Sequence, residues 1–205
     1  MTGVRALADQ DPARWRAATT SPFLDGAGTG DLPTAAFDRW LEQDRLFVEA
    51  LARAWGRLLA TAPTEDLPLL SDGIAAFTGE MMWFGELAAD RALAIPAPPL
   101  PATAAYGEEL ERLAAAPYPV ALAAMWAVEA AYLEAWRSAL PGAPAYRSFV
   151  AHWTDGAFAA FVARVETAAD RALAAASEAE RAQAAEAVAL IARREAAFWA
   201  MTWNG

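Results

Sequence analysis

Three acidic residues stand where the hydrophobic pattern of a helix calls for an apolar side chain. Asp44, Glu129 and Glu195 each interrupt the apolar stripe of a different predicted helix. A carboxylate among aromatic and aliphatic side chains must find hydrogen-bond partners or bind its proton more tightly than in water. Carboxyls of that kind can exchange protons near neutral pH, so the pattern indicates general acid–base chemistry.

If the three stripes face one interior, the carboxyls meet in a single cavity, as in other sites built inside helical bundles. Alternatively, each acid lies at the edge of its stripe, where it reaches solvent or pairs with an arginine such as Arg45, Arg193 or Arg194. A single acid would favour this second explanation. Because three long helices show the same interruption, we favour a site.

Apolar residues spaced three and four apart predict the helices that position these acids. Long helices are expected over 34–59, 69–93, 103–115, 119–139, 158–176 and 178–203, and shorter ones over 11–18 and around 146–153. Residues 21–33, rich in Gly, Asp and Pro, are predicted to form a loop. The prolines of residues 95–102 predict a stiff, non-helical connector. Ser177 with Glu180 predicts a capping box for the last helix.

The composition favours one all-α domain over residues 1–205. The chain is 57% hydrophobic with nine tryptophans, which suits one sizeable core. A net charge of −10 argues against a nucleic-acid partner, and the absence of cysteine excludes disulfides and a thiol nucleophile. No stretch has the roughly 20 apolar residues of a membrane span, so we expect a soluble, cytoplasmic protein with no membrane partner.

The single histidine, His152, bears on metal and haem binding. A di-metal carboxylate bundle would use paired Glu-x-x-His ligands, and no acid precedes His152 by three residues. Haem ligation by His152 is an alternative, but its neighbours Tyr146, Phe149 and Trp153 suit a core or a pocket wall equally well. We therefore expect His152 to serve in packing, with no metal and no cofactor.

The stretch SPFLDGAGTGDLPTAAFDRWLEQDRLFVEALARAW resembles the opening of TenA/thiaminase II proteins. The similarity continues in AAYGEEL around Tyr106, in PGAPAYRSF after residues 119–139 and in the C-terminal REAAFWAM. This resemblance implies a haem-oxygenase-like all-α bundle without haem. It also implies hydrolysis of the aminomethyl-pyrimidine left by thiamin breakdown, which releases ammonia and hydroxymethyl-pyrimidine for salvage; some members cleave thiamin itself.

The resemblance further implies roles for individual residues. Asp44 matches the aspartate that holds the aminopyrimidine, and Glu195 matches the glutamate that acts as acid and base. Tyr106 matches a pocket tyrosine, while Phe47 stands where a tyrosine is common.

In the cysteine-bearing branch of the family the nucleophile lies on the fourth long helix, where this chain has Met125. Methionine cannot form that covalent adduct, so the chain resembles the cysteine-less branch, in which a glutamate replaces the thiol. Glu129 lies one helical turn from Met125 and is the candidate. Trp153 stands in place of another pocket tyrosine, and Ser21 in place of the opening histidine.

We therefore expect an aminohydrolase of thiamin-derived aminomethyl- or formylaminomethyl-pyrimidine. Glu195 and Glu129 are its predicted catalytic residues, and Asp44, Phe47, Tyr106, Trp153 and Met125 its substrate-binding residues. One alternative is a non-catalytic, small-molecule-binding or regulatory TenA-like protein. A second is a cofactor-free oxidase of a quinone precursor, although such a site would be richer in His and Arg. The resemblance also implies a homo-oligomer, a dimer or a tetramer. The many Trp and Leu residues, which look exposed in the sequence, are compatible with a buried subunit interface.

Overall fold

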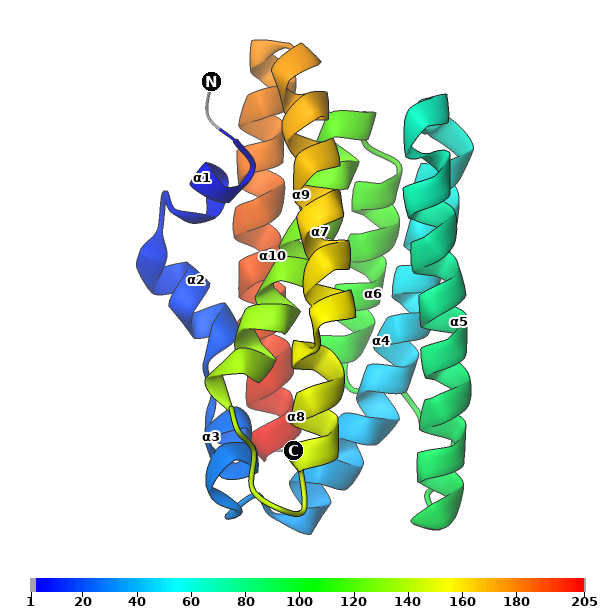
Figure 1. Ribbon diagram of the computed structural model, residues 1–205, viewed down its shortest axis with the longest axis vertical. Coiled ribbons are helices and arrows are strands. Elements are labelled where there is room, and N and C mark those ends of the chain that lie inside the picture. Colours follow the sequence, from blue (N-terminus) through cyan, green and yellow to red (C-terminus); the bar gives the residue numbers. More distant parts are fainter. Residues whose placement is uncertain (1–2, 205) are drawn as a thin grey trace.

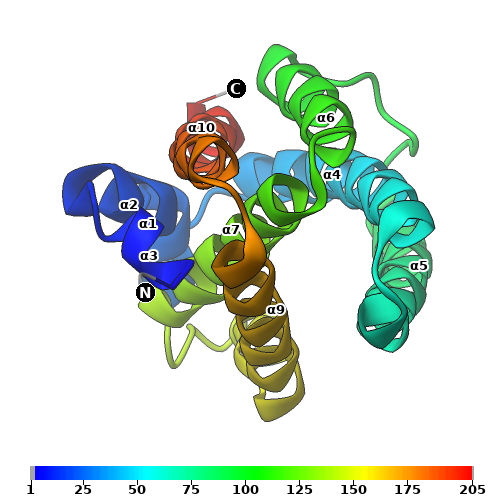
Figure 2. The same ribbon diagram turned by 90° about the horizontal axis from the view of Figure 1, so that it is seen from above.

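Helix α7 (Tyr118–Ser138) runs through the middle of the molecule, as two perpendicular views show (Figures 1 and 2). In the computed structural model, which describes residues 3–204, every residue from 120 to 133 is buried. Many of these residues are alanines, which favour the helix and let neighbouring helices approach closely. Helices α2, α8, α9 and α10 all pack against α7.

The other helices surround α7 and account for nearly all of the remaining chain. They are α1 (Arg5–Ala8), α2 (Pro12–Thr19), α3 (Pro22–Thr29), α4 (Thr34–Thr61), α5 (Leu67–Asp90), α6 (Pro101–Ala114), α8 (Arg147–Thr154), α9 (Gly156–Ala175) and α10 (Glu178–Asn204), with one 3₁₀ turn, η1 (Thr64–Asp66). No strand occurs in residues 3–204. The all-α prediction is confirmed, and the long helices lie within a few residues of their predicted bounds.

The prediction of a loop over residues 21–33 was wrong, because most of this segment forms α3. Ser21 caps the helix by accepting a hydrogen bond from the Leu24 N–H at 3.3 Å, and Pro22 occupies the first turn. Gly30 ends it in the left-handed conformation, with φ of 98°. Phe23 is fully buried against Trp40, Trp136 and Trp199, and this packing outweighs the weak helix propensity of the glycines.

The start of α10 carries the predicted capping box. The Ser177 N–H donates to the Glu180 carboxylate at 2.7 Å, and the Glu180 N–H donates back to the Ser177 hydroxyl at 3.2 Å. These reciprocal bonds satisfy N–H groups that the first turn of a helix leaves free.

Helices α5 and α9 extend from α4 and α7 toward the same side of the molecule (Figure 2). Helix α5 packs along α4, whereas α9 packs along α7 and follows α8 with a break at Asp155. The Asp155 carboxylate restarts the helix by accepting from the Phe158 N–H at 2.7 Å. Acidic and aromatic side chains from α4, α5, α7, α8 and α9 are thereby directed toward one interior space.

The tryptophans of this bundle are buried or half-buried rather than exposed. The large apolar side chains that are exposed among the described residues are Met82 and Leu140, so exposed tryptophans give no support to the expected oligomer. None of the helices within residues 3–204 combines the length and apolar character needed to cross a membrane.

Gly73 in α5 is expected to tolerate no side chain. A Cβ atom at this position would lie 2.9 Å from Cζ3 of the fully buried Trp55 and 3.1 Å from Cζ of Phe161. Gly73→Ala should therefore lower the free energy of unfolding by about 1–3 kcal/mol through overpacking. Gly56→Ala in α4 is the matched control, because a Cβ there meets nothing within 4 Å. It should raise stability by about 0.5–1 kcal/mol. Urea denaturation measures both changes, and equal effects would contradict the packing argument.

Candidate functional site

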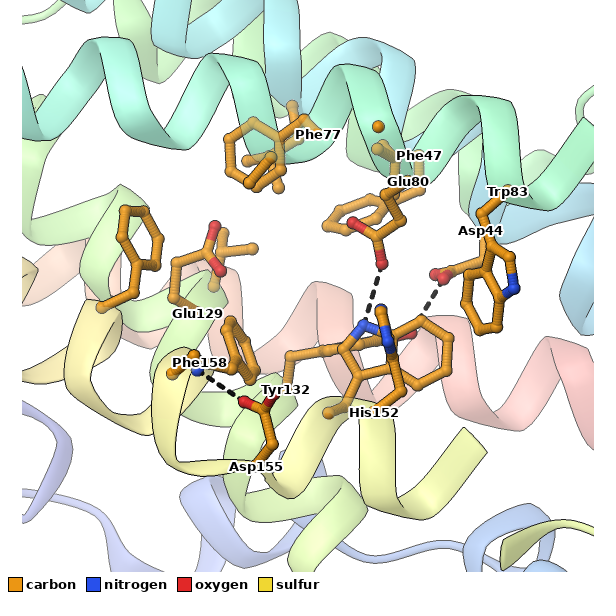
Figure 3. Close-up of a pocket in the computed structure, with 18 of the residues that line it drawn as sticks. Asp44, Phe47, Phe77, Glu80, Trp83, Glu129, Tyr132, His152, Asp155 and Phe158 are labelled. Carbon is orange, nitrogen blue, oxygen red and sulfur yellow. Dashed lines mark hydrogen bonds between the residues drawn. The ribbon is translucent and has the colours of Figure 1, made fainter. Parts of the chain in front are cut away.

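A cavity of about 490 Å³ lies between α4, α5, α7, α8 and α9 (Figure 3). Most of its wall is aromatic and aliphatic, and acidic groups are set into that wall. The lining residues are Asp44, Phe47, Val48, Leu51, Asp72, Ala76, Phe77, Gly79, Glu80, Trp83, Val128, Glu129, Tyr132, His152, Trp153, Asp155, Ala157, Phe158 and Phe161. None of these described lining residues is an arginine or a lysine, so no side-chain cation of that kind balances the carboxyls.

Asp44 is presented by α4 together with Phe47, Val48 and Leu51, at the spacing that places residues on one helix face. It is 1% exposed, and its Oδ2 accepts a hydrogen bond from the Tyr132 hydroxyl at 2.8 Å. Its Oδ1 has no partner among the described residues. Burial, and then the nearby Glu80 carboxylate, raise the pKa of Asp44 well above its usual range, although the Tyr132 bond works in the opposite direction.

Glu129 enters the cavity from α7. It is 4% exposed, and its Oε1 is buried without a hydrogen-bond partner among the described residues. Burial, followed by the carboxylates of Glu80 and Glu195, raises the pKa of Glu129 well above its usual range. An unpaired buried oxygen is costly, so the structure leaves Glu129 needing either a proton or a ligand that donates a hydrogen bond.

Glu195 and Tyr106 form a buried pair that is not part of the cavity lining. The Tyr106 hydroxyl donates to the Glu195 Oε1 at 2.6 Å, and each residue is 1% exposed. Burial raises the pKa of Glu195 to about 8, although the hydrogen bond from Tyr106 stabilises the carboxylate and works in the opposite direction. Glu195 also raises the pKa of Asp44 and of Glu129, so the pair belongs to the same electrostatic cluster as the cavity acids.

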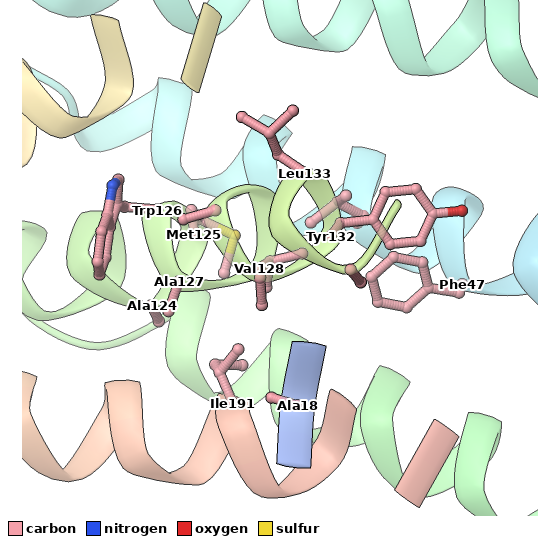
Figure 4. Packing of buried hydrophobic residues seen from close by; sticks show 14 of the residues in the cluster. Ala18, Phe47, Ala124, Met125, Trp126, Ala127, Val128, Tyr132, Leu133 and Ile191 are labelled. Carbon is pink, nitrogen blue, oxygen red and sulfur yellow. The ribbon is translucent and has the colours of Figure 1, made fainter. Parts of the chain in front are cut away.

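The remaining predicted site residues divide into two groups. Phe47 and Trp153 line the cavity, and Phe47 also packs on Tyr106 with ring centroids 4.8 Å apart. Met125 is fully buried and lies one turn before Glu129 in the apolar cluster near Val128 and Ile191 (Figure 4). It is not among the residues that line the cavity.

The predicted site set omitted Glu80, although it lines the cavity from α5. Its Oε1 accepts a hydrogen bond from Nε1 of Trp153 at 2.8 Å, and burial raises its pKa to about 7. The sequence held a signal for this residue. Glu80 is the one charged residue between Asp72 and Glu86, within an otherwise uncharged, largely apolar stretch of helix.

Tyr132 and His152 were also left out of the predicted site. Tyr132 lies three residues after Glu129 on the same stripe of α7, which was the available signal, and it bonds Asp44. His152 packs against Trp83 with ring centroids 4.5 Å apart and the ring planes tilted by 33°, at the cavity wall rather than in the core. The aromatic neighbours of His152 had suited a core or a pocket wall equally well, and the structure places it at the wall.

This arrangement suits a ligand that donates hydrogen bonds or carries positive charge. The aromatic walls can stack on a flat ring, and the free oxygens of Asp44 and Glu129 can accept from amino groups. Within residues 3–204, no group of three or more His, Cys, Asp or Glu side chains is placed to hold a metal ion. The cavity acids, with their raised pKa values, offer proton transfer between a carboxyl and a bound ligand.

Comparisons with known proteins agree with this fold. The model of the TENA/THI-4/PQQC family matches residues 13–205. A soybean (Glycine max) protein named "probable bifunctional TENA-E protein" is 28% identical over 200 residues, which cover 92% of this chain and 87% of the relative. A TenA homologue from Pyrococcus furiosus superposes with a TM-score of 0.92 at 24% identity, over 97% of this chain and 98% of its own. A TenA family transcription regulator from Silicibacter sp. TM1040 gives 0.89 at 19% identity, over 98% and 96%.

The raised pKa of Glu195 predicts a pH-dependent contribution to stability. The folded state keeps this proton up to about pH 8, whereas the unfolded chain loses it near 4.5, so the folded state binds more protons between these values. The contribution of Glu195 is therefore full below about pH 4.5 and is lost as the pH rises to about 8. Glu195→Gln should remove this loss. The free energy of unfolding of the variant minus that of the wild type should therefore be larger at pH 8 than at pH 5, by on the order of 3 kcal/mol.

Thermal and urea unfolding at both pH values measure this difference. Glu108→Gln, an exposed glutamate on α6, is the control and should change neither value. A stability difference between Glu195→Gln and the wild type that is the same at pH 5 and pH 8 would contradict the prediction.

Proposed function

The chain belongs to the TENA/THI-4/PQQC family, and from that premise we propose that it is an aminohydrolase of thiamin-derived aminomethyl- or formylaminomethyl-pyrimidine. The observation that carries the proposal is the aromatic cavity in which Asp44 and Glu129 each keep a buried oxygen without a partner. Each of these oxygens can accept a hydrogen bond from one amino group of such a pyrimidine, the ring amino group at one end and the aminomethyl nitrogen at the other. Hydrolysis of the aminomethyl compound consumes water and yields ammonia and the hydroxymethyl-pyrimidine.

In the proposed complex the pyrimidine ring lies between the aromatic walls, and Asp44 holds the ring amino group. Tyr132 fixes one oxygen of Asp44, which leaves Oδ1 to accept from the ligand. Trp153 is itself held in place, stacked on Trp136 with centroids 4.9 Å apart and edge-on to Trp40 at 5.4 Å. A preformed pocket of this kind orients the exocyclic carbon without further ordering of side chains.

Glu129 is the proposed proton donor. Because burial raises the pKa of Glu129 well above its usual range and so favours the protonated carboxyl, it can hand its proton to the departing nitrogen as the carbon–nitrogen bond breaks. Water supplies the oxygen that bonds to carbon, and its proton passes to a carboxylate of the cluster. For the formylated compound the same transfer protonates the nitrogen of the amide, which leaves formate and the free amine.

Glu195, the acid and base implied by the family resemblance, does not line the cavity. In this proposal Glu195, once ionised, raises the pKa of Asp44 and Glu129, and Tyr106 stabilises that ionised form by donating a hydrogen bond to its carboxylate. The sequence contains no cysteine, which supports assignment to the cysteine-less branch.

The test is turnover of both pyrimidines by the purified full-length chain, with ammonia and formate measured. Glu129→Gln should lower kcat by about 10²–10⁴-fold because Gln cannot donate the proton, while KM changes only a few-fold. Asp44→Asn should mainly raise KM. The amide keeps one oxygen that accepts a hydrogen bond, but it cannot become a carboxylate when the amino group of the ligand binds.

Glu108→Gln, on the exposed side of α6, serves as the matched control and should keep wild-type kinetics. Release of neither ammonia nor formate by the wild type would overturn the proposal. Thermal stabilisation by the pyrimidines without any turnover would identify the chain as a binding protein instead.

A further inference from the structure

Glu80 has no role in the mechanism so far, although it occupies the middle of the cavity. In Figure 3 it projects from α5 between Glu129 and Asp44. It interacts electrostatically with both acids, because its carboxylate raises the pKa of each. A ligand bound at both Asp44 and Glu129 would therefore pass Glu80.

One oxygen of Glu80 is fixed and the other is free. Oε1 accepts from the Trp153 indole N–H at 2.8 Å, and the stacking of Trp153 on Trp136 and its edge contact with Trp40 hold that donor rigidly. The hydrogen bonds of the described residues leave Oε2 without a protein donor. A fixed carboxyl with one free oxygen facing a cavity is the geometry of a group that contacts a water molecule or a substrate.

The surroundings of Glu80 and Glu129 separate their proton affinities. Both groups are buried, but Glu80 receives a hydrogen bond that stabilises its carboxylate, whereas Glu129 receives none on Oε1. Glu80 accordingly titrates at about 7, and the pKa of Glu129 lies well above its usual range. A pair of carboxyls separated in this way divides into a base, ionised first, and an acid, kept neutral.

We propose, building on the proposed function, that Glu80 is a further catalytic residue, the general base that takes the proton from the attacking water. The water oxygen bonds to the exocyclic carbon, or to the formyl carbon, as its proton moves to the free oxygen of Glu80. The carbon–nitrogen bond breaks as Glu129 protonates the nitrogen. Transfer of the proton from Glu80 back to Glu129 through solvent restores the starting state, so the protons balance.

The pH dependence of turnover reports this assignment. The titratable groups that share the cavity with Glu80 are Asp44 from α4, Asp72 from α5, Glu129 and Tyr132 from α7, His152 from α8, and Asp155 between α8 and α9. A base must be ionised to act, so kcat/KM should rise with pH through about 7, the pKa of Glu80.

Two variants separate catalysis by Glu80 from a structural role. Glu80→Gln keeps an acceptor for the Trp153 indole, so the fold should persist while kcat falls by about 10²–10⁴-fold and the rise of kcat/KM near pH 7 disappears. Trp153→Phe removes the donor that stabilises the carboxylate, which should shift this rise to higher pH. Glu86→Gln, an exposed glutamate on the same helix, is the control and should keep the wild-type profile.

Circular dichroism and thermal melting first verify that each variant is folded. If the wild type turns over a pyrimidine and folded Glu80→Gln keeps kcat within about threefold with the same pH profile, the assignment of Glu80 is overturned and the proposed function stands. If Glu80→Gln does not fold, an unshifted pH profile in Trp153→Phe overturns the assignment. Absence of turnover in the wild type defeats the proposed function itself.

Discussion

The cost of burying carboxyls in an aromatic interior is the constraint on which this structure depends. Asp44, Glu80, Glu129 and Glu195 all lie in or beside one cavity, and no arginine or lysine lines it among the described residues. An isolated buried charge would cost several kcal/mol, so burial raises the pKa of each of these groups. The same burial that packs the interior of the bundle thus also raises the pKa values of the site.

A few hydrogen bonds set how firmly each proton is held. Tyr132 donates to Asp44, Trp153 to Glu80 and Tyr106 to Glu195, whereas Glu129 has an oxygen without a partner. Each donor stabilises the ionised form of its acceptor and opposes the effect of burial. The aromatic residues therefore have two effects. Their rings form the walls of the cavity, and their O–H and N–H groups set the relative pKa values of its acids.

Much of the fold followed from hydrophobic periodicity, and so did the burial of Asp44, Glu129 and Glu195. Periodicity assigns one buried face to a helix, which is why Glu80 was missed: α5 packs on α4 with one face and lines the cavity with the adjacent one. Nor can it say which buried groups become partners, such as Glu195 and Tyr106 from α10 and α6. Helix α3 was missed because its caps and the buried ring of Phe23 outweigh its glycine content.

The acidic wall without arginine or lysine also limits which ligands the cavity can bind. A phosphate ester of the same pyrimidine would bring negative charge against Asp44, Glu80 and Glu129 with no such cation to receive it. Discrimination of this kind needs no steric barrier, since it follows from the cost of desolvating a phosphate group where no cation can pair with it. Under the proposed function, the cavity therefore favours the unphosphorylated pyrimidine over its phosphate ester.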